Sequence, residues 1–62
     1  MGPDSKHELA IARLVDNIDL AGKLSSASVE EVISHLNFAM TKADSNFLID
    51  YIRWRMDHPI VK

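Results

Sequence analysis

The chain is 62 residues long and has a formal net charge of −2. A chain of this length forms one small domain, residues 1–62, and it buries only about 60% of its unfolded surface, so its hydrophobic core is marginal. Because the sequence contains no cysteine, disulfides and thiolate metal sites are excluded as stabilisers, and a hydrophobic content of 47% excludes a disordered chain.

The first third of the chain predicts a helix over about residues 6–21. Ser5 and Glu8 have the spacing of a capping box, in which each side chain accepts a hydrogen bond from the backbone N–H of the other residue. Apolar side chains then recur with the helical period of about 3.6 residues. Gly22 follows at the position where a left-handed residue commonly ends a helix, and residues 1–4 are expected to be disordered.

The middle of the chain predicts a second helix over about residues 29–42. Ser28 and Glu31 repeat the capping-box spacing, and Ala27 is placed to pack against Val32 at the entry of the helix. One face of this helix is apolar, which indicates that it packs on the rest of the domain. This face carries Val29, Val32, Ile33, Leu36, Ala39, Met40 and Ala43.

A third helix is expected over about residues 45–57. Asp44, Ser45 and Asn46 offer its cap, and Pro59 ends it because a residue before proline is pushed out of the helical region. No segment has the pattern of a strand. The links between the helices are short enough for antiparallel neighbours, so we predict an all-α fold of three short helices in an antiparallel bundle.

The third helix is apolar over more than half of its circumference. Phe47, Tyr51 and Trp54 form one face, and further apolar residues continue around the other side. A helix of this kind needs burial on two sides, and the other two helices can cover only one of them. Its polar stripe consists of Asn46, Asp50, Arg53 and Asp57.

A second copy of the chain is the simplest cover for the remaining side, because a symmetric dimer lets one patch cover itself. Self-association also stabilises a domain whose own core is small. The alternative is that Ile60 and Val61 fold back over the surplus apolar surface. The residues predicted to form the partner or dimer interface are Phe38, Phe47, Leu48, Tyr51, Ile52, Trp54, Arg55 and Met56.

The sequence carries no pattern typical of a catalytic, cofactor or metal site. Glu31 and His35 are one helical turn apart, but no second histidine lies a turn from His35, so the two-histidine zinc spacing is absent. His7 and His58 fall near helix ends, where solvated or capping roles are common. No serine stands in a nucleophile-elbow context, and there is no glycine-rich phosphate loop. We therefore expect a non-enzymatic protein without cofactor or metal.

Nucleic acid is the alternative partner. Three short helices can form a helix-turn-helix, yet the link of residues 22–28 is longer than the usual turn, and the next helix opens with Glu30 and Glu31. Arg53 and Arg55 are flanked by acidic residues, which favours salt bridges within the helix over phosphate contacts. DNA binding is therefore the second hypothesis, behind a protein partner.

The expected location follows from what the chain lacks. It has neither an apolar run long enough for a membrane span nor a charged and then apolar leader. Its basic residues form no run, so non-specific affinity for nucleic acid is expected to be weak. We expect a cytoplasmic protein with no membrane partner.

The residues from Leu14 to Gly22, followed by a polar loop and by Val32, Ile33 and Leu36, resemble the small enterobacterial biofilm and acid-resistance regulators of the AriR/YmgB and Bdm type. In that family a helix ends in a small residue and glycine, a loop rich in Ser and Asn follows, and two amphipathic helices complete the chain. The resemblance covers roughly residues 9–57 and implies a helical dimer that acts as a connector in signalling or gene regulation.

A rival resemblance covers the second half of the chain alone. Residues 28–55 look like the helical hairpin of the sporulation checkpoint inhibitor Sda, and this likeness implies binding to a histidine kinase. Both resemblances imply a small helical regulator that works through protein contacts.

These observations together predict a small regulatory or adaptor protein that binds a protein partner through a helical surface. We expect it to be a homodimer. The alternatives are a small DNA-binding transcriptional regulator and a helical docking domain of a larger multienzyme. An enzyme is not expected, because catalysis needs a concave pocket that a bundle this small rarely provides.

Overall fold

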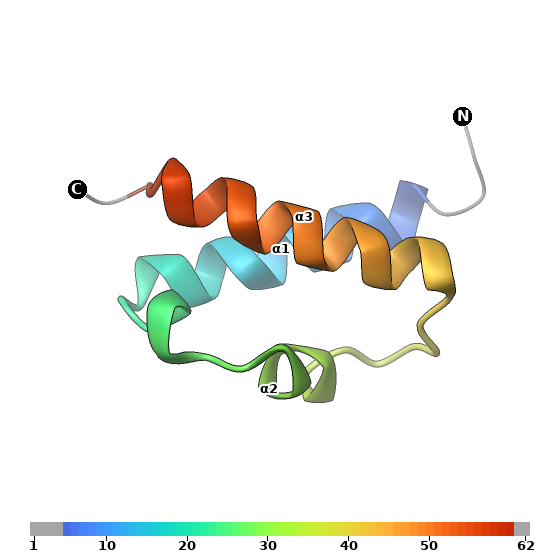
Figure 1. Ribbon diagram of the computed structural model, residues 1–62. Coiled ribbons are helices and arrows are strands. Elements are labelled where there is room, and N and C mark those ends of the chain that lie inside the picture. Colours follow the sequence, from blue (N-terminus) through green and yellow to red (C-terminus); the bar gives the residue numbers. More distant parts are fainter. Residues whose placement is uncertain (1–4, 61–62) are drawn as a thin grey trace.

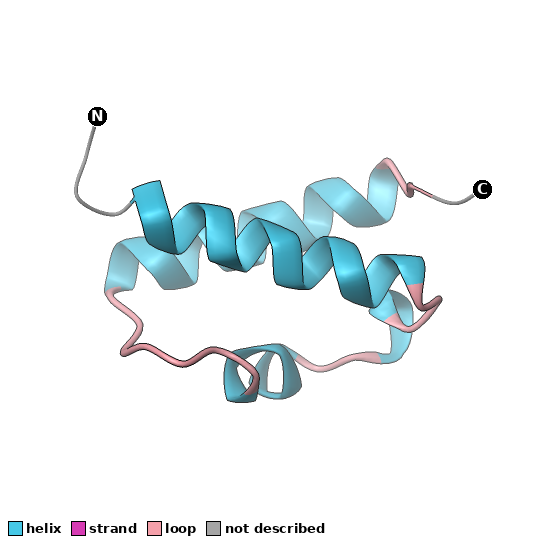
Figure 2. Cartoon of the chain, turned by 180° about the vertical axis from the view of Figure 1, so that it is seen from behind, coloured by secondary structure: helices cyan, strands magenta, loops and turns pink. Residues whose placement is uncertain are grey.

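A computed structural model describes the backbone of residues 5–60 and the side chains of residues 7–60. Within this range the chain forms three α-helices and one short 3-10 helix, and no strand (Figure 1 and Figure 2). The helices are α1 (Ser5–Leu20), α2 (Val29–Ser34) and α3 (Lys42–Asp57), and the 3-10 helix η1 covers Leu24–Ser26. The prediction of an all-α fold with three helices is confirmed, whereas the expectations for residues 1–4 and for the Ser5 cap lie outside the described atoms.

The two long helices lie side by side and run in the same direction (Figure 1). His7 near the start of α1 contacts Asp44 near the start of α3, and Asp16 in α1 contacts Arg55 in α3. The segment of residues 21–41 returns the chain along one side of this pair, and α2 is seen nearly end-on within it (Figure 2). The first and third helices are therefore parallel, as they are in an up-and-down bundle of three helices, but α2 lies across the return segment and does not run antiparallel beside them as expected.

The end of α1 follows the prediction from Gly22. This glycine has a φ of +73°, which is the left-handed region. Its N–H donates to the Asp19 carbonyl at 2.9 Å, and the Lys23 N–H donates to the Ile18 carbonyl at 3.1 Å. These two bonds form a Schellman motif, which satisfies carbonyl groups that a helix end otherwise leaves unpaired.

The second helix is much shorter than predicted, because α2 ends at Ser34 and not near residue 42. Ser28 caps its start as expected, with the Ser28 hydroxyl accepting from the Glu31 N–H at 3.1 Å. At its end the Ser34 hydroxyl donates to the Glu31 carbonyl at 2.7 Å, and the next turn tightens. Ser34, His35, Asn37 and Phe38 are all weak helix formers, so the apolar period alone did not extend the helix.

The third helix begins three residues before the predicted start at residue 45. Thr41 is its cap: the Thr41 hydroxyl accepts from the Asp44 N–H at 3.1 Å, and an Asp44 carboxylate oxygen accepts from the Thr41 N–H at 3.0 Å. This reciprocal pair is a capping box, and its Thr-x-x-Asp spacing is visible in the sequence. The C-terminal end at Asp57, before Pro59, agrees with the prediction.

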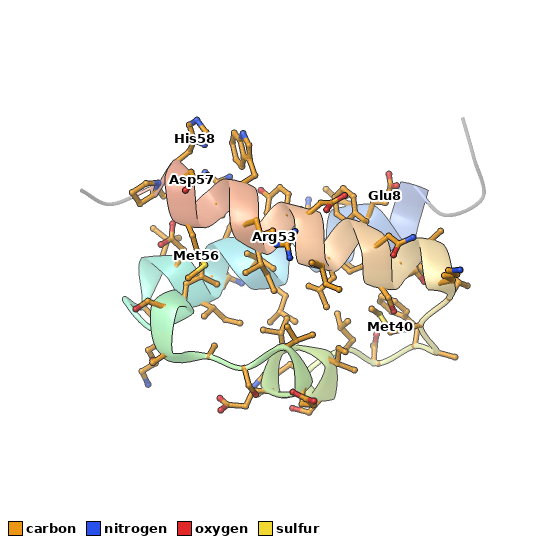
Figure 3. All side chains as sticks on the ribbon, in the orientation of Figure 1. Glu8, Met40, Arg53, Met56, Asp57 and His58 are labelled. Carbon is orange, nitrogen blue, oxygen red and sulfur yellow. The ribbon has the colours of Figure 1, made fainter. Side chains whose placement is uncertain are left out.

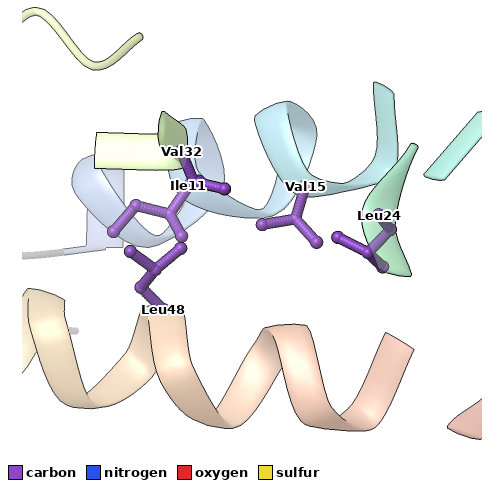
Figure 4. Close-up of a cluster of buried hydrophobic side chains, with 5 residues drawn as sticks. All are labelled: Ile11, Val15, Leu24, Val32 and Leu48. Atoms are coloured by element: carbon purple, nitrogen blue, oxygen red, sulfur yellow. The ribbon is translucent and has the colours of Figure 1, made fainter. Parts of the chain in front are cut away.

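The core is small and draws on every helical element (Figure 4). The fully or nearly buried hydrophobic side chains are Ile11, Val15, Leu24, Val32 and Leu48. The predicted polar stripe of α3 is exposed along its whole length. Ile60 turns back only through its backbone, since its N–H donates to Asp19 Oδ2 at 2.9 Å while its side chain stays exposed. It does not cover the apolar surplus of α3, and Val61 lies outside the described residues.

Candidate interaction surface on the third helix

Three aromatic rings follow one another along one face of α3, and the ring of His58, the residue that caps the C-terminal end of this helix, continues the row. The ring centroids are 5.6 Å apart for Phe47 and Tyr51, 5.9 Å for Tyr51 and Trp54, and 4.8 Å for Trp54 and His58. Their sequence spacing of four, three and four residues places them on the same side of a helix. Contacts at these distances contribute about 0.5 to 1.5 kcal/mol each beyond the area that they bury. We call these four residues the aromatic ladder.

An ion pair between the two long helices fixes the middle of the aromatic ladder. Arg55 Nε donates to Asp16 Oδ1 at 3.0 Å, and the Tyr51 hydroxyl donates to the same oxygen at 2.9 Å. Arg55 Nη2 also donates to the Tyr51 hydroxyl at 2.8 Å, and Arg55 Nη1 donates to the His58 carbonyl at 3.2 Å. The expected salt bridge of Arg55 within α3 is therefore wrong, because Arg55 pairs with Asp16 of α1.

The hydrogen bond with the Tyr51 hydroxyl raises the pKa of Arg55 above its ordinary value, and the charge of Asp16 acts in the same direction although burial opposes both. The guanidinium thus keeps its positive charge while it packs against aromatic rings. Its central carbon is 4.5 Å from the Trp54 ring centroid, a distance at which a cation attracts the face of an indole.

Trp54 is the member of the aromatic ladder that combines fixed packing with exposure. Its ring packs on His58 and on the Arg55 guanidinium, yet 48% of the residue remains exposed. His58 is in turn held by its backbone N–H, which donates to the Trp54 carbonyl at 3.0 Å. Figure 3 shows His58 at the outer end of α3, on the side opposite to Met56. Trp54 is therefore an aromatic side chain that packs on two neighbours and has about half of its surface uncovered.

The residues predicted as an interface do not form one continuous surface. Leu48 is wrongly placed in that set, because it is 0% exposed and packs in the core. Ile52 is half-buried against the same core, and Phe47 and Tyr51 are half-buried in the aromatic ladder. Trp54 and Met56 are the exposed members.

Phe38, the remaining member of the predicted interface, lies far from Trp54 at the other end of the molecule. Its ring stacks on the His7 ring with a centroid distance of 4.0 Å and an interplanar angle of 11°. His7 Nδ1 lies 3.0 Å from Asp44 Oδ2, which also accepts from the Thr41 N–H. The sequence predicts a solvated or capping role for His7 and carries no signal for this contact across 37 residues.

The same cluster holds the one buried charged residue of the described chain. Asp44 is 1% exposed, and its Oδ1 atom has no hydrogen-bond partner among the described residues. The backbone hydrogen bond from Thr41 lowers the pKa of the Asp44 carboxyl, and the bonds from His7 and from the Thr41 hydroxyl act in the same direction, against burial. Asp44 therefore caps α3 as a carboxylate and ties α1 to it through His7.

A groove of about 320 Å³ lies where the last turns of α1 and α3 meet. Two exposed apolar side chains, Leu20 from α1 and Met56 from α3, line it together with buried Leu24. Its remaining lining residues are Asp19, Gly22, Ser25, Arg55 and Pro59. A second hollow of about 260 Å³ is lined in part by Glu31 and His35, but the described residues contain no group of three side chains that could hold a metal ion.

Comparisons of the chain with protein-family models, with curated proteins and with solved structures give no match. None of the helices in the described part of the chain is long and apolar enough to cross a membrane.

Proposed function

We propose that the protein is a small regulatory or adaptor module that acts through protein–protein contacts of α3 and associates with a second copy of itself through the aromatic ladder. The observation that carries this proposal is Trp54, which is ordered by His58 and Arg55 and still 48% exposed. Tryptophan, tyrosine and arginine are the residues most enriched at the energetic centres of protein interfaces.

The order of the aromatic ladder supports binding as its role. A partner that contacts a mobile side chain must immobilise it, at a cost of about 0.5 to 1.5 kcal/mol for each flexible side chain. Trp54 is already packed on one side by the Arg55 guanidinium, which is itself held by Asp16. Such preorganisation has no evident use in folding alone, since the exposed face of Trp54 buries nothing within the described chain.

The charge distribution supports a protein partner over nucleic acid. Arg53 and Arg55 are the basic residues of α3 that could contact DNA, and Arg55 is engaged with Asp16 at 3.0 Å. Arg53 shares the exposed stripe of α3 with Asp50 and Asp57, which repel phosphate. A protein that binds a nucleic-acid backbone needs a basic surface, and this face does not supply one.

Sedimentation velocity across micromolar concentrations tests the self-association. We expect the wild-type mass to rise with concentration above the 7.0 kDa of one chain, and Trp54→Ala to remain at the mass of one chain. Leu9→Ala is the matched control, because Leu9 is a large apolar residue with 54% exposure that lies on α1. A wild-type chain that stays monomeric throughout, or a Leu9→Ala chain that dissociates as Trp54→Ala does, would contradict the proposal.

A gel-shift titration with duplex DNA at several salt concentrations tests the second hypothesis. Contacts to phosphates give an affinity that falls steeply as salt rises. We expect no shift at physiological salt, and a salt-dependent shift of the wild-type chain would favour DNA binding over the proposed role.

A further inference from the structure

We propose that the groove between Leu20 and Met56 is a docking site for a basic and apolar peptide segment of a partner protein. This inference rests on the proposed function only in treating the chain as a protein-binding module. It concerns a different face of α3 from the aromatic ladder. Trp54 and Met56 are two residues apart, which is about 200° around a helix axis, and Figure 3 shows Met56 directed toward η1 and away from the side of His58.

The apolar part of the groove is built from two helices. Leu20 is 54% exposed and Met56 is 49% exposed, and both line the groove above buried Leu24. Scattered single apolar residues on a surface need no explanation, but two large ones that line the same hollow form a shaped apolar site. Methionine is flexible and polarisable, so it adapts to side chains of different shape.

The negative charge at this end of the molecule favours a cationic group of a partner. Because α1 and α3 are parallel, both C-terminal ends lie at the same end of the bundle, and each contributes a partial negative charge (Figure 1). Asp19 lines the groove and adds a full negative charge. Its Oδ2 atom accepts from the Ile60 N–H, and no cationic side chain of the described chain lies within ion-pair distance of it.

Arg55 does not cancel the charge of Asp19, although it also lines the groove. Its guanidinium pairs with Asp16 at 3.0 Å, so these two charges offset each other. The Asp19 carboxylate and the two helix ends remain. A lysine or arginine of a partner that reaches Asp19 would therefore meet an unpaired negative charge beside an apolar surface.

The volume of the groove indicates that it holds a few side chains of a peptide. At about 320 Å³ the groove is at the lower end of the range for small-molecule pockets, about 300 to 1,000 Å³, and it would enclose a whole small molecule only in part. One or two apolar side chains can enter between Leu20 and Met56, and an adjacent cation can reach Asp19. A helix with an apolar stripe bordered by arginine or lysine has this arrangement.

Titration of the full chain with two designed peptides, followed by NMR of backbone amides and methyl groups, tests the proposal. The probe is a helical peptide of about 14 residues with leucine at positions i, i+3, i+4 and i+7 and arginine elsewhere. The matched control peptide has glutamate in place of every arginine. We expect the Leu–Arg peptide to shift signals of Leu20, Gly22 and Met56 with saturation, and the Leu–Glu peptide to leave them unchanged.

Two pairs of variants assign the binding to the groove. Leu20→Gln should weaken the Leu–Arg peptide about fivefold or more, whereas Leu9→Gln, at the same exposure on the same helix, should not weaken it. Asp19→Asn retains an oxygen for the Ile60 N–H but removes the charge, so it should lower both the affinity and its salt dependence. Asp50→Asn, an exposed carboxylate on α3, is its control.

Several results would overturn the inference. They are equal affinity for the two peptides, equal loss in Leu20→Gln and Leu9→Gln, or no saturating shift at millimolar peptide. Shifts of Leu20 and Met56 with protein concentration alone would show that a second copy fills the groove, which also contradicts it. Self-association through Trp54 is measured separately by sedimentation, so either proposal can fail while the other stands.

Discussion

Asp16 on α1 and Arg55 on α3 are joined at 3.0 Å, and the Tyr51 hydroxyl bonds to both of them. This three-residue contact connects the packing of the two long helices to the orientation of Trp54, because the Arg55 guanidinium lies 4.5 Å from the centre of the Trp54 ring. The proposed interaction surface is thus held by a residue on the other helix. A change in Asp16 should be detected at Trp54 without any direct contact between them.

The Asp16→Asn substitution should increase the mobility of the Trp54 side chain. The amide cannot form the ion pair with Arg55, so the guanidinium loses a charged partner and holds the indole ring less firmly. Time-resolved fluorescence anisotropy measures this motion directly, because Trp54 is the one tryptophan of the chain. We expect a larger amplitude of fast depolarisation in Asp16→Asn and no change in Asp50→Asn, whose carboxylate is exposed. Equal behaviour of the two variants would show that the ion pair does not order Trp54.

Leu48→Ala should destabilise the fold far more than Ile49→Ala. Leu48 is 0% exposed in the core, and truncation of a buried leucine costs about 2 to 5 kcal/mol, whereas Ile49 is 38% exposed. A domain of this size has a total stability of only about 3 to 5 kcal/mol, so Leu48→Ala should leave a large unfolded fraction. Urea denaturation followed by circular dichroism gives both values. If Leu48→Ala lost as little free energy of unfolding as Ile49→Ala, Leu48 would not be a core residue and could belong to the predicted interface.

The helical class and most of the helix ends could be read from the sequence, because they depend on local chemistry. Gly22 marks the end of α1 through its left-handed conformation, and Pro59 follows the end of α3. The start of α3 has an equally local signal in the Thr-x-x-Asp spacing of Thr41 and Asp44, whereas the polar run of Asp44, Ser45 and Asn46 predicts a later start. The polar stripe of α3 was also predictable, since every member of it is exposed.

The contacts between helices could not be predicted from the sequence pattern. The apolar period predicts a second helix that reaches residue 42. It takes no account of the low helix propensity of Ser34, His35 and Asn37, which together end the helix early. The register of the parallel helices α1 and α3 decides that Asp16 meets Arg55 and that His7 meets Asp44. Helical periodicity sorts residues into faces of one helix, but it does not say which face another helix covers.

Gly22→Ala should cost about 1 to 2 kcal/mol of the free energy of unfolding, which is the penalty of a side chain in the left-handed region. Its φ is +73°, and no heavy atom beyond Gly22 and its two chain neighbours lies within 4 Å of the place that a Cβ would occupy, so the cost comes from the backbone conformation. Gly22→Asn should cost less, because asparagine adopts this region more readily. Urea denaturation of both variants checks the order. A loss in Gly22→Asn as large as that in Gly22→Ala would point to crowding around the side chain instead.

The carboxylate of Asp44 should make the fold sensitive to acid. The hydrogen bond from the Thr41 backbone lowers the pKa of Asp44 below the ordinary value of 3.8, and the bonds from His7 and the Thr41 hydroxyl add to this. The unfolded chain therefore takes up a proton at higher pH than the folded chain does. The stability that Asp44 contributes is complete above pH 3.8 and is lost as pH falls through that value toward the lower pKa of the folded state.

Urea midpoints measured from about pH 5 down to about pH 2 test this dependence. We expect Asp44→Asn to be less stable than the wild type above the transition and to lose less stability as the pH falls. Asp50→Asn, which alters an exposed carboxylate, should keep the wild-type slope. An Asp44→Asn chain with an unchanged acid slope would mean that Asp44 does not link protonation to the packing of α1 on α3.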